Sequence, residues 1–447
     1  MKKSYVFIAI LVILVAGLSY GFKYLLDRAP IFTGYAAKEV ASQIFVNGRD
    51  FESVKQNDIN FSLIPLSSIS VDTINKEVNT SFLGFAKQKA VYRDGLGCAL
   101  IADGDESYAK TLFSKVPILP ANPQKIFWPM GDKLRDTILP SVDVKNLQQV
   151  IDSFASIGKT RAIIVAIDSL MMFESYSGGF DKNTRILGWS MTKSITNAFI
   201  GILVKQGFLE IDKPAPIGEW ANDNRKNISL RHLLTMTSGL KWVEDYGDIS
   251  EATIMLYQKG DVGSYAISTP AIFPPDSVWY YSSGTSNILS LIMRRTINND
   301  RQYWDFPRNQ LFNRIGMRSA IIETDASGTF VGSSYVQAVP RDYARFGLLY
   351  LQNGIWQNDT ILPSGWVDFS RSEAPNSNGE YGAQFWLNLS GSELPDCPKD
   401  IYFCDGFNGQ RIYIIPSKRM VIVRMGLSKS GEFDYNSMVK SILETVD

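Results

Sequence analysis

The chain has 447 residues, of which 45% are hydrophobic and 12% aromatic, with 45 basic and 45 acidic side chains. This length allows a large core, in one large domain with additions or in two domains. Balanced charge without a basic run argues against nucleic acid as a partner. One His and three Cys argue against zinc, which needs about four ligands. We expect neither a metal site nor another cofactor.

An apolar segment lies at the N-terminus, where Lys2 and Lys3 precede the uncharged run Tyr5–Phe22. Its length nearly reaches the ~20 residues that a membrane helix needs, whereas a cleaved signal has a shorter apolar region of about 7–15 residues. We favour an anchor over residues 5–26. The lysines then stay inside, and the rest of the chain lies on the periplasmic side of the inner membrane. Cleavage within residues 17–21 would instead release a secreted protein.

The remaining sequence divides into an N-terminal cap or subdomain, residues 28–139, and a main body, residues 140–447. Residues 1–27 form the anchor or signal segment. In the cap, Gly34–Val46 has a helical pattern that turns extended. Ala90–Ala102 has the pattern of two strands joined by a glycine turn.

The main body begins with an amphipathic helical pattern, Val144–Phe154, and a buried strand, Arg161–Asp168. A hairpin partner and then an apolar helix follow directly. Such an order predicts an α+β fold, an antiparallel sheet with helices packed on it, and not alternating βαβ units. Further expected elements are Ser169–Tyr176, Tyr265–Phe273, Asn287–Arg295, Pro340–Gly354, Tyr381–Asn388, Gln410–Pro416, Met420–Gly426 and Phe433–Val446.

The apolar helix, Gly188–Gly207, carries the candidate chemistry at its start. Ser190 and Lys193 are three residues apart and share one helix face. The segment is too apolar for a surface helix, so the lysine needs a lowered pKa or a hydrogen-bonded partner. We therefore predict Ser190 as nucleophile and Lys193 as proton acceptor. The same spacing recurs at Ser107, Ser156, Ser238 and Ser437, but only Ser190 opens a long apolar helix.

Two other serine mechanisms fit poorly. A Ser-His-Asp triad would need His232, the only histidine, which precedes two leucines in a predicted helix and has a structural role in our interpretation. The second mechanism is that of the α/β-hydrolases, whose nucleophilic serine lies in a Gly-x-Ser-x-Gly turn. Here Thr192 occupies the position of the second glycine.

A lysine mechanism needs a second acid or base, and Tyr281 is the candidate. A phenol near a cationic lysine is expected to shift toward phenolate. Core packing is the alternative, because Trp279 and Tyr280 are adjacent. The oxyanion donors are expected at the backbone N–H of Ser190 and in the stretch Cys404–Phe407.

Four ordered motifs, Ser190–Lys193, His232–Leu240, Tyr281–Ser283 and Gly406–Gln410, resemble the β-lactamase-related serine hydrolases. This family includes class C β-lactamases and 6-aminohexanoate-dimer hydrolase. The resemblance covers residues 140–447. It implies a β-lactamase/transpeptidase-like antiparallel sheet flanked by helices, with a mostly helical lobe and the site between them.

Carried over by position, the resemblance implies Ser190 as the acylated residue, Lys193 as its partner and Tyr281 as general acid/base. Ser283 stands where the family usually has Asn, and no Lys-Thr-Gly motif occurs near Ile401–Phe403. The missing lysine would have bound a substrate carboxylate, so a small-molecule amide or ester without that group is expected. Expected substrate-binding positions are Ser283, Trp189, Cys404 and Gly406.

The leading hypothesis is thus a serine hydrolase that cleaves an amide or ester through an acyl-enzyme. The alternative is a non-catalytic envelope binding protein that keeps the fold. Cys397 and Cys404 either form a disulfide or remain free thiols, and Cys98 is expected to be a small buried residue.

Overall fold

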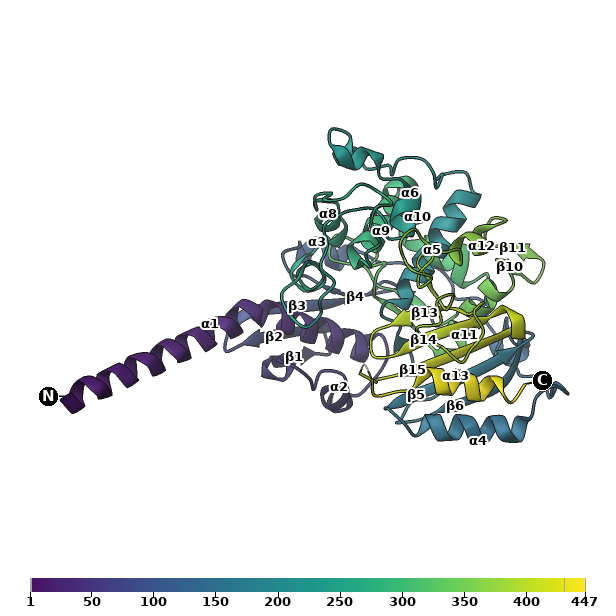
Figure 1. Cartoon of the computed structure of the whole chain (residues 1–447), viewed down its shortest axis with the longest axis horizontal. Helices are drawn as coiled ribbons and strands as arrows, with labels where there is room; N and C mark the ends of the chain where they lie inside the picture. Colours follow the sequence, from purple (N-terminus) through teal and green to yellow (C-terminus); the bar gives the residue numbers. More distant parts are fainter. Residues whose placement is uncertain (1, 430, 447) are drawn as a thin grey trace.

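The computed structural model describes residues 2–429 and 431–446. Its main body is built on a six-stranded antiparallel sheet in the order β12-β13-β14-β15-β5-β6 (Figure 1). The strands are β5 (Thr160–Ile167), β6 (Leu170–Tyr176), β12 (Trp386–Leu387), β13 (Tyr402–Gly406), β14 (Gln410–Ile415) and β15 (Met420–Gly426).

Both faces of this sheet are covered, and strand β5 shows why. All eight of its residues are buried. Ala162, Ile164 and Ala166 belong to one core cluster, whereas Ile163 and Val165 belong to the other, as the alternation of side chains along a strand requires. Helices α5 (Met191–Lys205) and α11 (Pro340–Leu351) pack on the first face. Helices α4 (Val144–Ala155) and α13 (Tyr435–Leu443) cover the second face.

A mostly helical lobe lies between β7 and the closing strands. Its largest helix is α9 (Ser283–Ile297), which packs on α5, α6 and α8. The other helices are α6 (Leu230–Leu234), α7 (Glu251–Gln258), α8 (Val262–Ile267), α10 (Asp300–Phe306) and α12 (Trp366–Ser370). The short strands are β7 (Ile186–Leu187), β8 (Ile321–Ile322), β9 (Val336–Ala338), β10 (Ile355–Trp356) and β11 (Asp359–Thr360).

The N-terminal region contains one long helix, α1 (Lys2–Phe45), packed against a four-stranded antiparallel sheet, β1-β2-β3-β4 (Figure 1). The expected extended end of Gly34–Val46 was wrong, because the helix continues to Phe45. Buried alanine and valine side chains at 36, 37, 40 and 41 form one helical face. The other elements of this region are α2 (Phe51–Asn57), β1 (Ser68–Asp72), β2 (Glu77–Phe82), β3 (Phe85–Arg93), β4 (Gly97–Leu100) and α3 (Glu106–Thr111).

Helix α1 has two different halves. By its length and composition, α1 could cross a membrane. Among the described residues, no other helix is long and apolar enough to do so. Its first half is exposed and projects away from the body (Figure 1), whereas most residues from Ala29 to Ala41 are buried. Lys38 pairs with Glu323 at 2.6 Å in a buried contact. The second half of α1 is therefore a core element of the protein.

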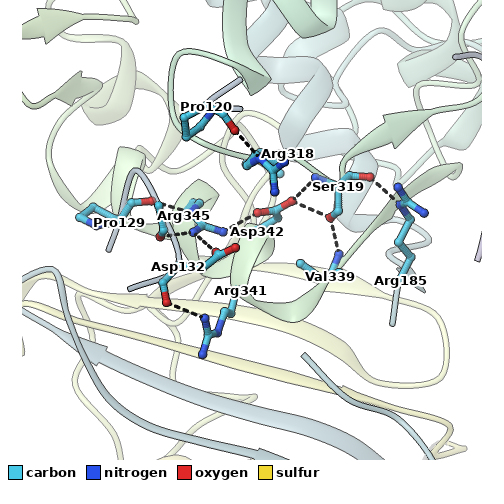
Figure 2. Close-up of polar contacts among 12 residues, drawn as sticks. Pro120, Pro129, Asp132, Arg185, Arg318, Ser319, Val339, Arg341, Asp342 and Arg345 are labelled. Carbon is cyan, nitrogen blue, oxygen red and sulfur yellow. Dashed lines mark hydrogen bonds and ion pairs between the residues drawn. The ribbon is translucent and has the colours of Figure 1, made fainter. Parts of the chain in front are cut away.

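A second network ties residues 120–132 to helix α11 (Figure 2). Arg345 donates to the carbonyl oxygen of Pro129 and pairs with Asp132 and Asp342. Asp342 in turn accepts from the backbone N–H and hydroxyl of Ser319. Each charged group in this network has a partner of opposite charge or a hydrogen bond. The network therefore holds residues 120–132, which precede the main body, against helix α11.

Two local expectations were wrong, and one question that the sequence left open is answered. Helix α8 covers only Val262–Ile267, so the helical interpretation of Tyr265–Phe273 was too long. Strand β12 covers only two residues of the expected Tyr381–Asn388 strand, because the chain there bends back on itself through a Tyr381–Trp386 bridge. Cys397 and Cys404 are free thiols. They lie in different core clusters, which excludes the disulfide alternative.

Candidate active site

The nucleophile candidate Ser190 stands at the start of helix α5, directly before its first residue, Met191. The preceding residue, Trp189, has φ of 48°, in the left-handed region that a bulky side chain rarely adopts. Strain of this kind costs about 1–3 kcal/mol and clusters at functional sites. The turn leaves Ser190 half-buried at a pocket, while Met191 to Leu203 are all buried.

Lys193 reaches back from the first turn of α5 and makes three hydrogen bonds. Its Nζ lies 3.0 Å from Ser190 Oγ, 2.9 Å from Ser283 Oγ and 3.1 Å from the carbonyl oxygen of Ser333. Its side chain is 1% exposed. Burial lowers the pKa of Lys193 to about 8, although the negative charges of Glu244 and Asp405 oppose the shift. A substantial neutral fraction therefore exists near neutral pH.

A carboxylate that the sequence interpretation missed, Glu244, supports this lysine. It accepts hydrogen bonds from the Ser283 hydroxyl and from the Tyr246 hydroxyl at 2.7 Å, and from the Trp242 indole N–H at 2.5 Å. Because Ser283 donates to Glu244, its oxygen is left to accept from Lys193. The short stretch Trp242–Tyr246 carries no catalytic motif, and only the folded loop brings it to the lysine.

Tyr281 lies beside the same pair. Lys193 Nζ lies 4.7 Å from the centre of the Tyr281 ring. The ring also packs against Trp386 and Tyr381. Burial raises the pKa of Tyr281 well above its ordinary value. The expected shift toward phenolate was therefore wrong, because desolvation disfavours the charged phenolate, and the group stays a neutral phenol.

The four expected substrate-binding residues occupy different places. Trp189 lines the pocket, whereas Ser283 is 0% exposed and lies behind Lys193. Gly406 ends strand β13 so close to the nucleophile turn that an added Cβ would lie 2.2 Å from the carbonyl oxygen of Gly188. Cys404 points into the core beside Ser194, and burial raises its thiol pKa to about 12.

The pocket at Ser190 has a volume of about 100 Å³ and is lined by residues from several separate parts of the chain. Trp189, Ser190 and Phe407 belong to the expected site region, and Tyr246 comes from the loop that carries Glu244. Helix α1 adds a wall that nothing in the sequence motifs indicated. The contributing side chains of α1 are Arg28, Ile31, Phe32 and Tyr35, joined by Phe61, Leu63 and Ile64 of the following segment.

His232 lies outside this site and caps a helix. Its Nδ1 accepts the backbone N–H of Ser229 at 3.0 Å, and its Nε2 lies 3.2 Å from Asp276. The predicted structural role of the only histidine is confirmed by these contacts.

Comparison with known proteins agrees with the fold. The family model described as Beta-lactamase matches residues 159–446. The 6-aminohexanoate-dimer hydrolase of Paenarthrobacter ureafaciens is 24% identical over 293 residues, 60% of this chain and 72% of that protein.

Solved structures share the fold. A putative 6-aminohexanoate-dimer hydrolase from Bacillus anthracis superposes with a TM-score of 0.58 at 21% identity, over 74% of this chain and 90% of that one. A penicillin-binding protein homologue from Caulobacter crescentus gives 0.55 at 14% identity, over 68% and 97%.

A match over more than half of the chain defines the class: a serine hydrolase fold of the β-lactamase type, as the resemblance implied. The chain belongs to the beta-lactamase family.

Proposed function

We propose that the protein is a membrane-anchored serine hydrolase that cleaves an amide or ester through an acyl-enzyme on Ser190. One observation carries the proposal. The amine of Lys193 lies 3.0 Å from the Ser190 hydroxyl and is held there by two further acceptors, Ser283 Oγ and the Ser333 carbonyl. In the neutral amine, two hydrogens are directed at those acceptors, so the lone pair faces Ser190.

Acylation then follows from the positions of these groups. Ser190 Oγ attacks the substrate carbonyl carbon while Lys193 takes the hydroxyl proton. The backbone N–H of Ser190 and one from the end of β13 near Gly406 stabilise the oxyanion. Tyr281, a neutral phenol with a strongly raised pKa, gives its proton to the leaving amine or alcohol and recovers one from Lys193.

Hydrolysis reverses these roles. Water attacks the acyl carbonyl while the neutral amine of Lys193 takes the water proton, and Lys193 then returns that proton to Ser190 Oγ as it leaves. No carboxylate-binding cation is supplied by the residues that line the pocket, because Arg28 is paired with Asp248 at 2.7 Å. This favours substrates without a carboxylate at that position.

The continuity of helix α1 supports an anchor. The apolar run lies in the same helix as the buried residues from Ala29 onward, and the buried Lys38–Glu323 pair holds that second half in the body. An uncleaved α1 therefore connects the membrane directly to the active site. By the positive-inside tendency, Lys2 and Lys3 place the body outside the cytoplasm.

A fluorophosphonate probe tests the catalytic proposal. We expect covalent labelling of the full chain, complete loss in Ser190→Ala, and labelling slowed by at least about a hundredfold in Lys193→Ala. Ser107→Ala is the matched control, because Ser107 has the same spacing to a lysine but is exposed outside the site. Labelling that survives Ser190→Ala would overturn the proposal in favour of a binding protein.

A further inference from the structure

We propose that the substrate is a lipid resident in the bilayer, and that its acyl chain lies in the pocket along helix α1 with the scissile carbonyl at Ser190. This proposal rests on the hydrolase function above and specifies its substrate class. It follows from the juxtaposition of the membrane helix, the apolar pocket and the nucleophile.

The first observation is the direction of the pocket along α1. Tyr35 stacks on Trp189, next to the nucleophile, with ring centres 6.0 Å apart. Ile31 and Phe32 line the pocket one turn earlier, and Arg28 lines it one turn before that. Arg28 to Tyr35 spans about 10 Å of helix, the length of roughly eight carbon–carbon bonds in an extended chain. The pocket therefore runs from Ser190 toward the membrane end of α1.

The second observation is the distance to the bilayer. The apolar run ends at Phe22, six residues before Arg28. This interval is about 9 Å of helix, whereas the polar layer of one leaflet is about 5–8 Å thick. With α1 spanning the membrane, Arg28 lies at the outer boundary of the head groups. A chain leaving the leaflet thus reaches the pocket without crossing bulk water.

The third observation is the chemistry of the walls. The lining is mostly apolar and aromatic, with Ile31, Phe32, Phe61, Leu63 and Ile64 among its members. Its two charged residues, Arg28 and Asp248, are paired with each other. A neutral acyl chain fits this lining, because each methylene removed from water gains about 0.8 kcal/mol, or about fourfold in binding.

A fourth observation is independent of the pocket. The turn between β2 and β3 carries Leu83 and Phe85, which are 66% and 59% exposed. Thr33 donates to the carbonyl oxygen of Ala86 at 2.9 Å, near the start of β3. The end of β3 pairs with the start of β4, where the backbone N–H of Cys98 bonds to Glu323, the partner of Lys38. This turn therefore lies on the membrane side of the body, where exposed apolar side chains can enter the head-group layer.

The opposite end of the same sheet offers a control. Ile74, in the turn between β1 and β2, is 91% exposed and lies at the other end of β2. It has comparable apolar character but faces away from the membrane side.

The chain-length test uses the full chain in phosphatidylcholine nanodiscs with p-nitrophenyl acetate, butanoate and octanoate. We expect kcat/KM to be at least tenfold higher for octanoate than for butanoate, given about fourfold per buried methylene. Ile31→Trp fills the pocket and should reduce this preference at least fivefold. Ile44→Trp, also half-buried on α1 but outside the lining, should keep it.

The membrane test uses 4-methylumbelliferyl oleate in phosphatidylcholine vesicles. Leu83→Asp combined with Phe85→Asp should lower turnover of this ester at least fivefold relative to turnover of soluble p-nitrophenyl acetate, and Ile74→Asp should leave the ratio unchanged. Acetate hydrolysis with no gain for longer chains would overturn this inference while leaving the hydrolase function intact. Failure of every ester together with absent fluorophosphonate labelling would overturn both.

Discussion

The pH dependence of turnover follows directly from the environment of Lys193. An ordinary lysine with a pKa of 10.5 is neutral in only about 1 molecule in 3,000 at pH 7. Burial lowers the pKa of Lys193 to about 8, which makes about 1 in 11 neutral. Because neutral Lys193 is the base, kcat/KM should rise about tenfold from pH 7 to pH 9 and level off above that.

The assay is kcat/KM for a soluble p-nitrophenyl ester between pH 6 and 9.5. No falling limb is expected in this range, because the pKa of Tyr281 is raised well above 10. Glu244→Gln removes a negative charge that raises the pKa of Lys193, so the midpoint should move to lower pH in that variant. A rate that decreases above pH 7, or one that still rises tenfold per pH unit at pH 9.5, would refute the assignment of Lys193 as the base.

Three further changes have defined outcomes. Tyr281→Phe should lower kcat by about 10²–10⁴-fold. Fluorophosphonate labelling should persist, since that probe has no amine or alcohol leaving group that needs a proton. Unchanged ester turnover would contradict the role of Tyr281 as general acid. Gly406→Ala should abolish turnover with the protein still folded, because its Cβ would lie 2.2 Å from the Gly188 carbonyl oxygen; near-normal kcat would count against a close approach of β13. Lys38→Met leaves Glu323 buried without its cation, so the free energy of unfolding should fall by about 3 kcal/mol. Thermal denaturation measures this change, and adding Glu323→Gln to the same protein should restore part of the lost stability.

Local spacing, together with the apolar helix that follows, was sufficient to predict the contact between Ser190 and Lys193. Ser190 and Lys193 lie on one helix turn, and their hydrogen bond depends only on that turn being formed. Tyr281 was a candidate from its local sequence, with core packing as the alternative, and a motif order resembling a known family favoured the candidate role. The antiparallel sheet was likewise predictable, because two successive strands are followed directly by an apolar helix.

Long-range contacts were not predictable in the same way. Glu244 meets Ser283 across 39 residues, and no residue pattern in Trp242–Tyr246 marks a carboxylate partner of the lysine. Helix α1 reaches the pocket through a contact between Tyr35 and Trp189, which are more than 150 residues apart in the sequence. The protonation of Tyr281 was also missed, because it depends on how deeply the ring is packed against Trp386.

The most direct test of the central claim is mass spectrometry of protein quenched during turnover of p-nitrophenyl octanoate. The account predicts an octanoyl adduct of the intact chain, with the modified peptide mapping to Ser190, that disappears once the substrate is consumed. Sustained hydrolysis with an adduct on another residue, or with Ser190 never acylated, would contradict it.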